Sequence, residues 1–586
     1  MKYSFLFLFL VVAHLSFSQT RNDTIKTEKL IIVKQYSPTL NDAFKVKTKP
    51  QVSDSILKTQ KNVDYSIFSV PVASTFTPTK GKASNISQQS LPYTYNNYAK
   101  LGVGNYLNIL GQFYGSIDIN QYQKLEIDFN HLSSSGGIEG VVLDDNFLDS
   151  SLDVNFKSSE NNFDWNAGVG LLYKRYNWYG VDQSRISQQG LLFVEELSAI
   201  DPLQTYFGAN LNGQIEFISS MVEQLSFKLA SFSDAYGSSE LNTIVDADFN
   251  FPINTNALSL NFNLDFLSGG FDNFYNNTPT NARGNLDYGF LATSLYPSYQ
   301  FSSGDLSVDI GAKVTFLNNS EASESDIFVY PKLNASYDLS ENLMLYAGVT
   351  GDLNKNSYQT IVERNPFVSP TLEIQPTDNA CTGFIGFNGS IEKLGYNFKA
   401  FGKQENANLF FVENPVTTGG LINFEPMDNY EFSNSFQVVY DDLFTLGVNA
   451  EATYSILDDF EVGLSATYYN YTVDNLPEAS NLPDLEVSMN AKYKIAERWF
   501  LSSTLFYVGE RESLGYISGP ADGIDFSSQS VDGFVDFNLG VNYQLSERLG
   551  LFISGQNLFD NNYQYWRNFE VQGIQVMGGL SYQFDW

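Results

Sequence analysis

The sequence predicts an all-β protein, a transmembrane antiparallel β-barrel of about 22 strands with an extended N-terminal arm. Runs of alternating apolar and polar residues recur from about residue 99 to the C-terminus, and the last run ends on an aromatic residue. Aromatic residues make up 15% of the chain and charged residues 17%. A strand places successive side chains on opposite faces, and a membrane barrel needs one face for lipid and one for a hydrated lumen.

The first eighteen residues predict a secretory signal peptide. Residues 1–4 form a short basic start, residues 5–13 an apolar core, and residues 16–18 supply small side chains before a cut at Gln19. The first residue after the expected cut is Gln19 rather than a cysteine, which excludes a lipid anchor at that position. Beyond residue 18 no stretch approaches the roughly 20 apolar residues of a spanning helix.

Residues 19–98 predict a basic, largely irregular arm that lies in the periplasm or in the lumen. This segment holds eleven basic and five acidic residues, a net charge of +6, and its prolines are too closely spaced for long regular elements. Two apolar patches stand out, at residues 30–33 and 65–72. Either the arm is a tether with two short strand-forming pieces, or one patch adds as a strand to a periplasmic partner and the other packs in the barrel.

Residues 99–586 predict the barrel itself, with 21 basic and 61 acidic residues and a net charge of −40. The run 485–495 places Leu485, Val487 and Met489 on one face, and Glu486, Ser488 and Lys492 on the other. Burying such charged side chains in a dry interior would cost several kcal/mol each. A hydrated lumen, and therefore a membrane barrel rather than a soluble sandwich, fits this pattern.

The number of strands follows from the turns, because bacterial barrels keep short turns inside and long loops outside. Ten short polar links predict periplasmic turns, and together with both termini inside they give about 22 strands. The expected turns lie near residues 120, 161, 220, 255 and 304, and at 341–342, 394–395, 458–459, 497–498 and 547–548. The expected outer loops lie near 134–149, 180–203, 268–284, 355–378, 413–430, 509–531 and 560–572, with a first hairpin near 104–105.

The C-terminal strand predicts a signal for insertion into the outer membrane. Ile574, Val576, Leu580, Tyr582, Phe584 and Trp586 share one face of this strand. The terminal strand must pair with the first strand when the barrel closes. We therefore expect Tyr582, Phe584 and Trp586 to direct insertion by the barrel-assembly machinery.

The sequence offers no catalytic set, cofactor site or metal site, so we do not expect an enzyme. His131 is the one histidine left after signal removal, and Cys381 lies in a strand-like run as a small strand residue. Acids expected on the inner face could pair as catalytic carboxylates, but no spacing brings two of them together, and the paired aspartates lack calcium-loop spacing. The acids in question are Glu451, Glu486, Asp536 and Asp585. The acidic body also disfavours nucleic-acid binding.

Three aromatic runs fall near expected outer strand ends, at residues 177–180, 468–471 and 563–566. Tyr and Trp are enriched where a membrane protein meets the lipid headgroups. We predict that these runs are girdle anchors rather than platforms on which a ligand stacks.

The motif Asn557-Leu-Phe-Asp560, followed by Asn562-Tyr563, lies one strand before the aromatic terminus and resembles the penultimate-strand signature of TonB-dependent receptors. The stretches 408–411 and 454–464 are similar to the later barrel of that family. Residues 27–34, which contain Leu30, Ile31, Ile32 and Val33, resemble its energy-coupling box. The resemblance implies a receptor or transport barrel, but an arm of about 80 residues predicts the absence of a complete plug domain.

Two function classes remain open, both in the outer membrane. The first is a receptor-like barrel that takes part in solute binding or passage. The alternative is a non-transporting barrel subunit of an outer-membrane protein assembly. We expect outer-membrane lipid, the barrel-assembly machinery and a periplasmic or outer-membrane protein bound by the N-terminal arm as partners, and no nucleic acid.

Overall fold

A computed structural model describes residues 95–182, 200–253, 256–275, 283–414, 429–457, 459–517 and 525–586. The predicted signal peptide, residues 19–94 of the arm and the segment Leu30, Ile31, Ile32 and Val33 lie outside the described residues. The predicted lack of a complete plug concerns this same region and stays a prediction.

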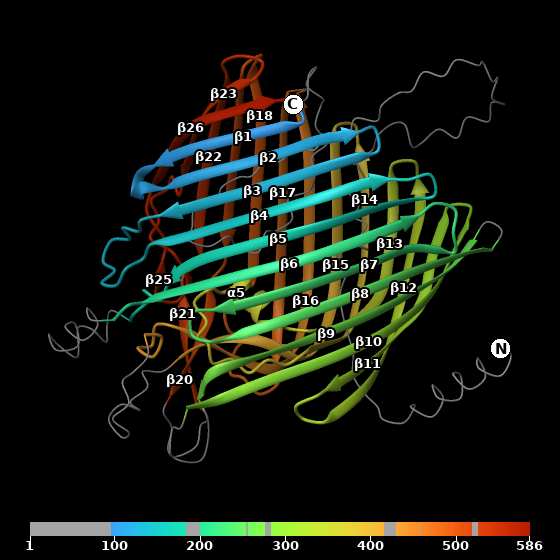
Figure 1. Ribbon diagram of the computed structural model, residues 1–586, viewed down its shortest axis with the longest axis horizontal. Coiled ribbons are helices and arrows are strands. Elements are labelled where there is room, and N and C mark those ends of the chain that lie inside the picture. The colour runs from blue at the N-terminus through green and yellow to red at the C-terminus, as the bar shows by residue number, and fades with distance from the viewer. Residues whose placement is uncertain are drawn as a thin grey trace.

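Twenty-two strands close into one antiparallel barrel, as the sequence predicts (Figure 1). From β1 to β19 each strand pairs with its neighbour in the chain, and the wall continues through β22, β23 and β26. The first and last strands close the circle, with Asn97 opposite Phe584 and Gly104 opposite Met577. Closure leaves the wall without an unpaired edge, which a lipid-exposed sheet requires.

The wall strands in the first half of the chain are β1 (Asn97–Gly104), β2 (Ile109–Asn120), β3 (Gln123–Ser134), β4 (Phe147–Ser159), β5 (Phe163–Asn177), β6 (Leu203–Phe217), β7 (Val222–Asp234), β8 (Ser239–Ile253), β9 (Asn256–Tyr275), β10 (Arg283–Ser303) and β11 (Leu306–Asn319). Those in the second half are β12 (Glu324–Ser340), β13 (Leu343–Asn354), β14 (Thr377–Ile391), β15 (Leu394–Glu413), β16 (Phe436–Leu457), β17 (Phe460–Val473), β18 (Leu485–Ala496), β19 (Trp499–Val508), β22 (Phe534–Gln544), β23 (Leu549–Gln556) and β26 (Gln575–Phe584). Two hairpins lie in outer loops, β20 (Arg511–Ile517) with β21 (Asp525–Val531), and β24 (Gln564–Trp566) with β25 (Phe569–Glu570).

The ten expected inner turns all separate neighbouring wall strands, although one position was wrong by two residues. β14 ends at Ile391 and β15 begins at Leu394, so Gly395 belongs to a strand and the turn is residues 392–393. Three outer connections were not predicted, at residues 235–238, 320–323 and 474–484. The first two are as short as inner turns, so loop length alone does not reveal their side of the membrane.

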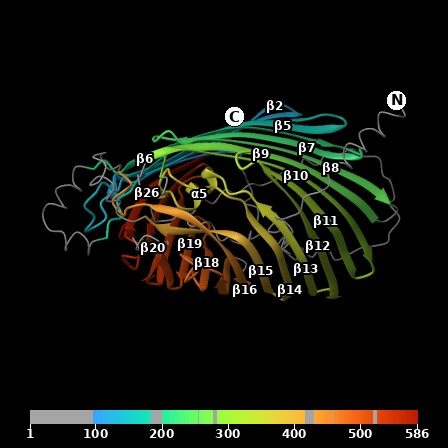
Figure 2. The ribbon, with the colours of Figure 1, turned by 90° about the horizontal axis from the view of Figure 1, so that it is seen from below.

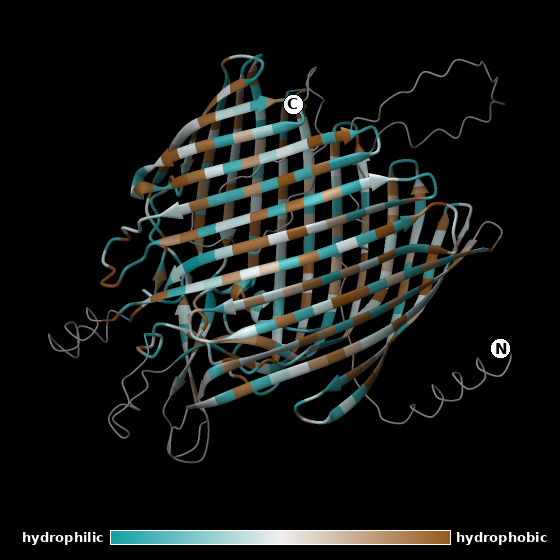
Figure 3. Ribbon diagram, in the orientation of Figure 1, coloured by the Kyte–Doolittle hydropathy of each residue, from teal (hydrophilic) through white to brown (hydrophobic). Residues whose placement is uncertain are grey.

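Hydropathy alternates along the wall strands, as banding in Figure 3 shows. Leu446, Val448 and Met489 are exposed on the outer face, where lipid would cover them. On the inner face, Lys157 contacts Glu126 at 2.6 Å across β4 and β3. Charged side chains of opposite sign therefore pair along the inner wall, in agreement with a hydrated lumen.

Helix is almost absent from the described residues, which hold the helix α5 (Tyr358–Arg364) and the 3-10 turn η1 (Asn105–Leu107). Neither is long and apolar enough to cross a membrane. Figure 2 shows α5 inside the barrel, with wall strands on both sides of it.

The motif that resembles the family signature forms the turn that leaves β23. Asn557 is fully buried and adopts a positive φ of 47°. Its side-chain amide donates to the carbonyls of Asn561 and Gln572 at 2.9 and 3.0 Å, and its side-chain oxygen accepts from the Asn561 N–H. Asparagine tolerates this backbone region better than most residues, so one side chain fixes both the turn and the loop that follows.

Substitution Asn557→Ala is expected to lower the free energy of unfolding by about 3 kcal/mol, because three hydrogen bonds are lost in a buried position and alanine disfavours positive φ. Urea unfolding of the barrel in lipid vesicles would measure the change. Asn562→Ala, at an exposed position in the same loop, is the control. A loss below 1 kcal/mol for Asn557→Ala would contradict this role of the side chain.

Candidate functional site

A buried apolar cluster lies across the outer end of the lumen, and we call it the mouth cluster. It joins side chains of the outer ends of the wall strands to side chains of five outer loops. The loops contribute Ile138 and Leu143; Trp178, Tyr179 and Val181; Tyr358, Ile361, Val362, Phe367, Val368, Leu372 and Ile374; Tyr430; and Trp566 and Phe569. Outer loops of the described chain therefore fold inward and pack against one another over the outer end of the barrel.

Helix α5 anchors the cluster to the wall. Ser357 accepts a hydrogen bond from the Thr360 N–H in a capping box. The buried carboxylate of Glu240, on β8, accepts from the N–H groups of Tyr358 and Gln359 at 2.5 and 3.2 Å. A carboxylate at the first turn of a helix satisfies N–H groups that have no partner within the helix. The first turn of α5 is therefore tied to one position on the inner wall.

The phenol of Tyr358 adds a second tie. Its hydroxyl donates to Asp234 at 2.7 Å, and its ring packs against Phe232 on β7 and Phe271 on β9, the two strands that flank β8. Burial, together with the Asp234 carboxylate, raises the pKa of Tyr358. The phenol therefore stays protonated and can serve as the donor in this hydrogen bond.

The hairpin β24–β25, residues 564–570, lies at the centre of the mouth cluster, and we call it the inner hairpin. The ring of Phe569 stacks on Phe367 with centroids 3.7 Å apart, and it meets Tyr179 edge-on at 5.0 Å. Trp566 packs against Phe411 and Phe436 at 4.9 and 5.5 Å. One short segment thus contacts the loops or strand ends that follow β5, β13 and β15.

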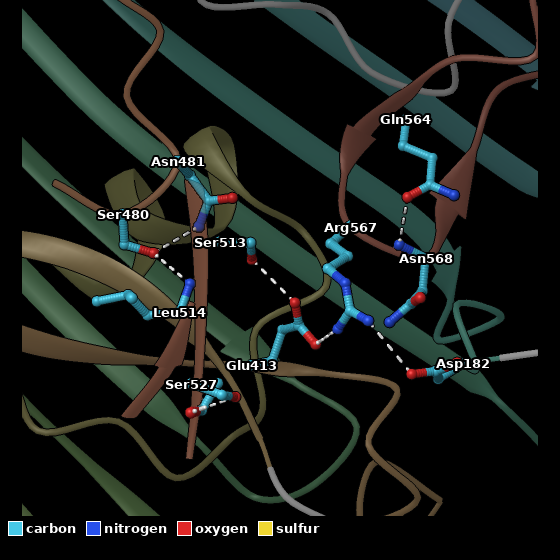
Figure 4. Close-up of polar contacts among 11 residues, drawn as sticks. Asp182, Glu413, Ser480, Asn481, Ser513, Leu514, Ser527, Gln564, Arg567 and Asn568 are labelled. Atoms are coloured by element: carbon cyan, nitrogen blue, oxygen red, sulfur yellow. Dashed lines mark hydrogen bonds and ion pairs between the residues drawn. The ribbon is translucent and has the colours of Figure 1, made fainter. Parts of the chain in front are cut away.

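Ion pairs fix the tip of the inner hairpin, as Figure 4 shows. The guanidinium of Arg567 contacts Glu413 at 2.6 Å and Asp182 at 3.2 Å. Glu413 also accepts a hydrogen bond at 2.9 Å from the hydroxyl of Ser513, on β20. The side chains of Arg567 and Asp182 are 18% and 17% exposed and that of Glu413 is 8% exposed, so water screens these contacts weakly.

Arg511, on β20, holds the inner hairpin from another side. It is buried, donates to the backbone carbonyls of Gln564 and Tyr565, and lies over the rings of Phe534 and Tyr565. Burial lowers the pKa of Arg511 to about 10, which leaves the guanidinium charged at neutral pH. Arg511 therefore binds the inner hairpin through aromatic rings and backbone carbonyls rather than through an ion pair with an acidic side chain.

A crevice of about 530 Å³ remains at the outer end, between the wall strands β10 to β12 and the loop that follows α5, and we call it the outer crevice. Aliphatic and aromatic side chains, among them Phe290, Phe328 and Leu353, form part of its lining. The acids that line it are Asp287, Glu321, Glu324, Asp326, Glu373 and Asp378. Neither lysine nor arginine is present among these lining residues, so the crevice attracts positive charge.

A second cavity, of about 580 Å³, lies against the inner wall near the periplasmic turns. Glu216, Glu223 and Asp248 line it together with Asn261 and Tyr296. Acidic side chains therefore line both the outer crevice and a cavity at the opposite end of the barrel.

The structure separates the inner acids that the sequence singled out. Glu451 pairs with Asn397 and Asp536 with Tyr563, while Glu486 faces Tyr469 and Asp585 accepts from the backbone of Asn96. These four acids therefore have separate partners. Within the described ranges, no group of three or more His, Cys, Asp or Glu side chains could hold a metal ion.

Two of the three aromatic runs were wrongly predicted to be girdle anchors. Trp178, Tyr179, Tyr563 and Trp566 are buried at the outer end of the barrel, because their loops fold into the lumen. In the third run Tyr468 is half exposed on the outer face. Aromatic content alone does not distinguish a side chain that meets lipid from one that packs between loops.

The predicted insertion residues lie on the closing strand. Tyr582 is opposite Ala99 of β1 and Leu549 of β23, and its ring stacks on Phe584 at 5.8 Å. Trp586 follows the strand and is exposed. Their part in insertion stays a prediction.

Sequence reasoning missed the arginines of the outer loops. Arg511 and Arg567 are two of 21 basic residues in a body with 61 acids. Because acids are so numerous, an arginine in a long outer loop has acids within reach wherever that loop packs. The small number of basic residues could therefore have marked these arginines, although it does not indicate which acids they pair with.

Comparison with known proteins identifies the family. The sequence profile of the family described as "TonB dependent receptor-like, beta-barrel" matches residues 61–558. No curated protein matches the sequence.

Among solved structures, the siderophore receptor PirA from Acinetobacter baumannii superposes with a TM-score of 0.60 at 11% identity, over 85% of this chain and 81% of that one. The FrpB iron transporter from Neisseria meningitidis gives 0.62 at 11% identity, over 84% and 83%. The copper transporter OprC gives 0.55 at 13% identity, over 85% and 82%. These likenesses concern the fold. With the family match and the closed 22-stranded barrel, they show that the chain belongs to the TonB-dependent receptor-like β-barrel family and is an outer-membrane protein with a general receptor or transport role.

Proposed function

We propose that the protein binds a positively charged solute at its outer mouth and passes it through the barrel into the periplasm. The observation that carries this proposal is the outer crevice, which combines an apolar wall with six carboxylates at the outer end of the barrel. Few convergent polar groups on an apolar wall are typical of small-molecule sites.

A cationic metal chelate fits this chemistry best, because the described residues include no group of three or more acids placed to ligate a bare metal ion. The similar structures are named as a siderophore receptor, an iron transporter and a copper transporter, which supports a metal-bearing solute. Carboxylate oxygens in a half-enclosed space attract such a cation, and nearby aromatic walls accommodate the apolar part of a chelator. The alternative function, a non-transporting subunit, receives no support from the comparisons.

The triple substitution Glu324→Gln, Asp326→Asn and Glu373→Gln is expected to weaken solute binding about tenfold at low salt, because it removes three of six like charges around the crevice. Binding of iron and copper chelates of positive and negative charge to the purified barrel would measure the effect by calorimetry. The control is Glu341→Gln, Glu497→Gln and Glu547→Gln, at exposed inner turns. Equal loss with both triple variants, or preference for anionic chelates, would contradict the proposal.

We further propose that Leu30, Ile31, Ile32 and Val33 bind the periplasmic partner that drives uptake, by adding as a strand to its sheet. Proline cannot donate the hydrogen bond that strand addition needs. Ile31→Pro with Val33→Pro is therefore expected to abolish accumulation of iron or copper by cells while leaving chelate binding unchanged. Ile31→Val with Val33→Ile is the control, and unchanged accumulation in the proline variant would exclude this segment as the coupling site.

A further inference from the structure

We propose that Arg567 is a latch that holds the inner hairpin across the outer mouth, and that its release from Glu413 and Asp182 opens the barrel to solute. This inference rests on the proposed function, because an opening mouth matters only if solute passes. It adds a specific residue and a specific moving segment to that function.

The inner hairpin depends on its neighbours for its position. β24 and β25 pair at Gln564 with Glu570 and at Trp566 with Phe569, and their register shifts between these two pairs. An isolated hairpin of this length is unstable in water. Contacts with other loops therefore decide where the segment lies.

Arg567 connects parts of the chain that are otherwise separate. Asp182 lies in the loop after β5, Glu413 ends β15, and Arg567 lies between β24 and β25. Glu413 also pairs in parallel with Gly515, so the same contact reaches the β20–β21 hairpin. Loss of the Arg567 guanidinium would remove the ion pairs that tie the tip of the inner hairpin to the loop after β5 and to the end of β15.

The chemistry of this contact suits a reversible closure. Each ion of the set, Arg567, Glu413 and Asp182, is held by a partner on another loop and can be hydrated when the loops part. Arg511 differs, because its partners are backbone carbonyls and aromatic rings at the base of the hairpin. The geometry therefore makes Arg511 the fixed point about which the tip at Arg567 moves, in the manner of a loop hinge.

A buried thiol behind the hairpin reports opening without requiring transport. Ser369 is fully buried, and its N–H and hydroxyl donate to the carbonyl of Phe436, whose ring packs against Trp566 and Phe569. Cysteine has nearly the same size as serine. The full chain would carry Cys381→Ser and Ser369→Cys, and whole cells would be treated with a membrane-impermeant maleimide. Arg567→Gln with Glu413→Gln removes the latch charges without leaving Glu413 as an unpaired buried acid.

The latch variant is expected to be labelled about tenfold faster than the parent, within the range by which coupled equilibria shift when one contact is lost. Arg567→Lys keeps the charge but loses the planar fork, and it should give an intermediate rate. The matched control is Lys174→Gln, which breaks a pair of 2.9 Å with Asp149 between strands already joined by backbone hydrogen bonds. Heat-modifiable migration would confirm that each variant is folded.

Labelling at the parent rate in the folded latch variant would overturn the inference, and so would equally fast labelling of the Lys174→Gln control. Failure of the proposed function has a different signature. If the latch variant is labelled faster while neither it nor the parent binds or accumulates any metal chelate, the latch stands and the transport proposal fails.

Discussion

Removal of residues 19–90 together with replacement of residues 564–570 by a Gly-Ser linker is expected to convert the protein into a cation-selective pore. The mouth cluster packs over the outer end, and the inner hairpin contributes Trp566 and Phe569 to it. The arm, with a net charge of +6, is attracted to a body of −40 and should lie at the other end of the lumen. Either deletion alone is therefore expected to leave the conductance close to that of the intact protein.

Single-channel recordings in planar bilayers would measure the conductance of the intact protein, the arm deletion, the hairpin replacement and the protein with both changes. Conduction after arm deletion alone would show that the mouth cluster does not seal the barrel. Conduction after hairpin replacement alone would show that the arm lies outside the lumen, as expected if it binds a periplasmic partner. The four recordings thus separate the two places that the sequence leaves open for the arm.

The cation selectivity of the doubly altered protein should come from acids on the inner wall. Asp246 and Asp248 accept hydrogen bonds from Asn263 and Asn261 on the inner wall, so their charges face the pathway. Substitution of both by Asn should reduce the preference for cations severalfold while the conductance stays within about twofold. Selectivity should also fade as salt rises, because screening lengths drop from about 8 Å at physiological ionic strength to about 3 Å at 1 M. Anion preference would contradict the charge argument.

The barrel wall could be predicted because the pattern of each strand depends only on residues next to one another in the sequence. Along 485–495 each residue has only two possible environments, lipid and hydrated lumen, and strict alternation assigns them without knowledge of any partner strand. Turns such as Glu341-Asn342 follow from the same reasoning, since a short polar link between two alternating runs can only reverse the chain. The strand count therefore emerged from counting links.

The mouth cluster could not be predicted, because its contacts join loops far apart in the sequence. Tyr563 and Trp566 have the composition of girdle residues, and nothing near them in sequence indicates that Trp566 meets Phe411 or that Tyr563 stacks on Phe534. Arg567 finds one partner 154 residues away and the other 385 away. Alternation carries no information about such pairings, since a loop that folds inward obeys no strand period.

Deletion of residues 584–586 is expected to reduce the amount of protein assembled at the cell surface at least tenfold. Phe584 pairs with Asn97 at the point of closure, and the Asn97 side chain donates to the Phe584 carbonyl at 2.9 Å. Asp585 accepts from the backbone N–H of Asn96. Without these residues the first and last strands lose their periplasmic end contacts, and the aromatic terminus proposed as the insertion signal is gone.

Heat-modifiable migration and surface labelling of whole cells would measure assembly of the truncated protein. Trp499→Ala removes an exposed aromatic residue at the inner end of β19, away from the seam, and serves as the control. If loss of any interfacial aromatic residue impaired assembly, both proteins would fail together. If closure and insertion depend on the terminus itself, Trp499→Ala should assemble normally, and normal assembly of the truncated protein would show that Tyr582 and the remaining pairs of β26 suffice.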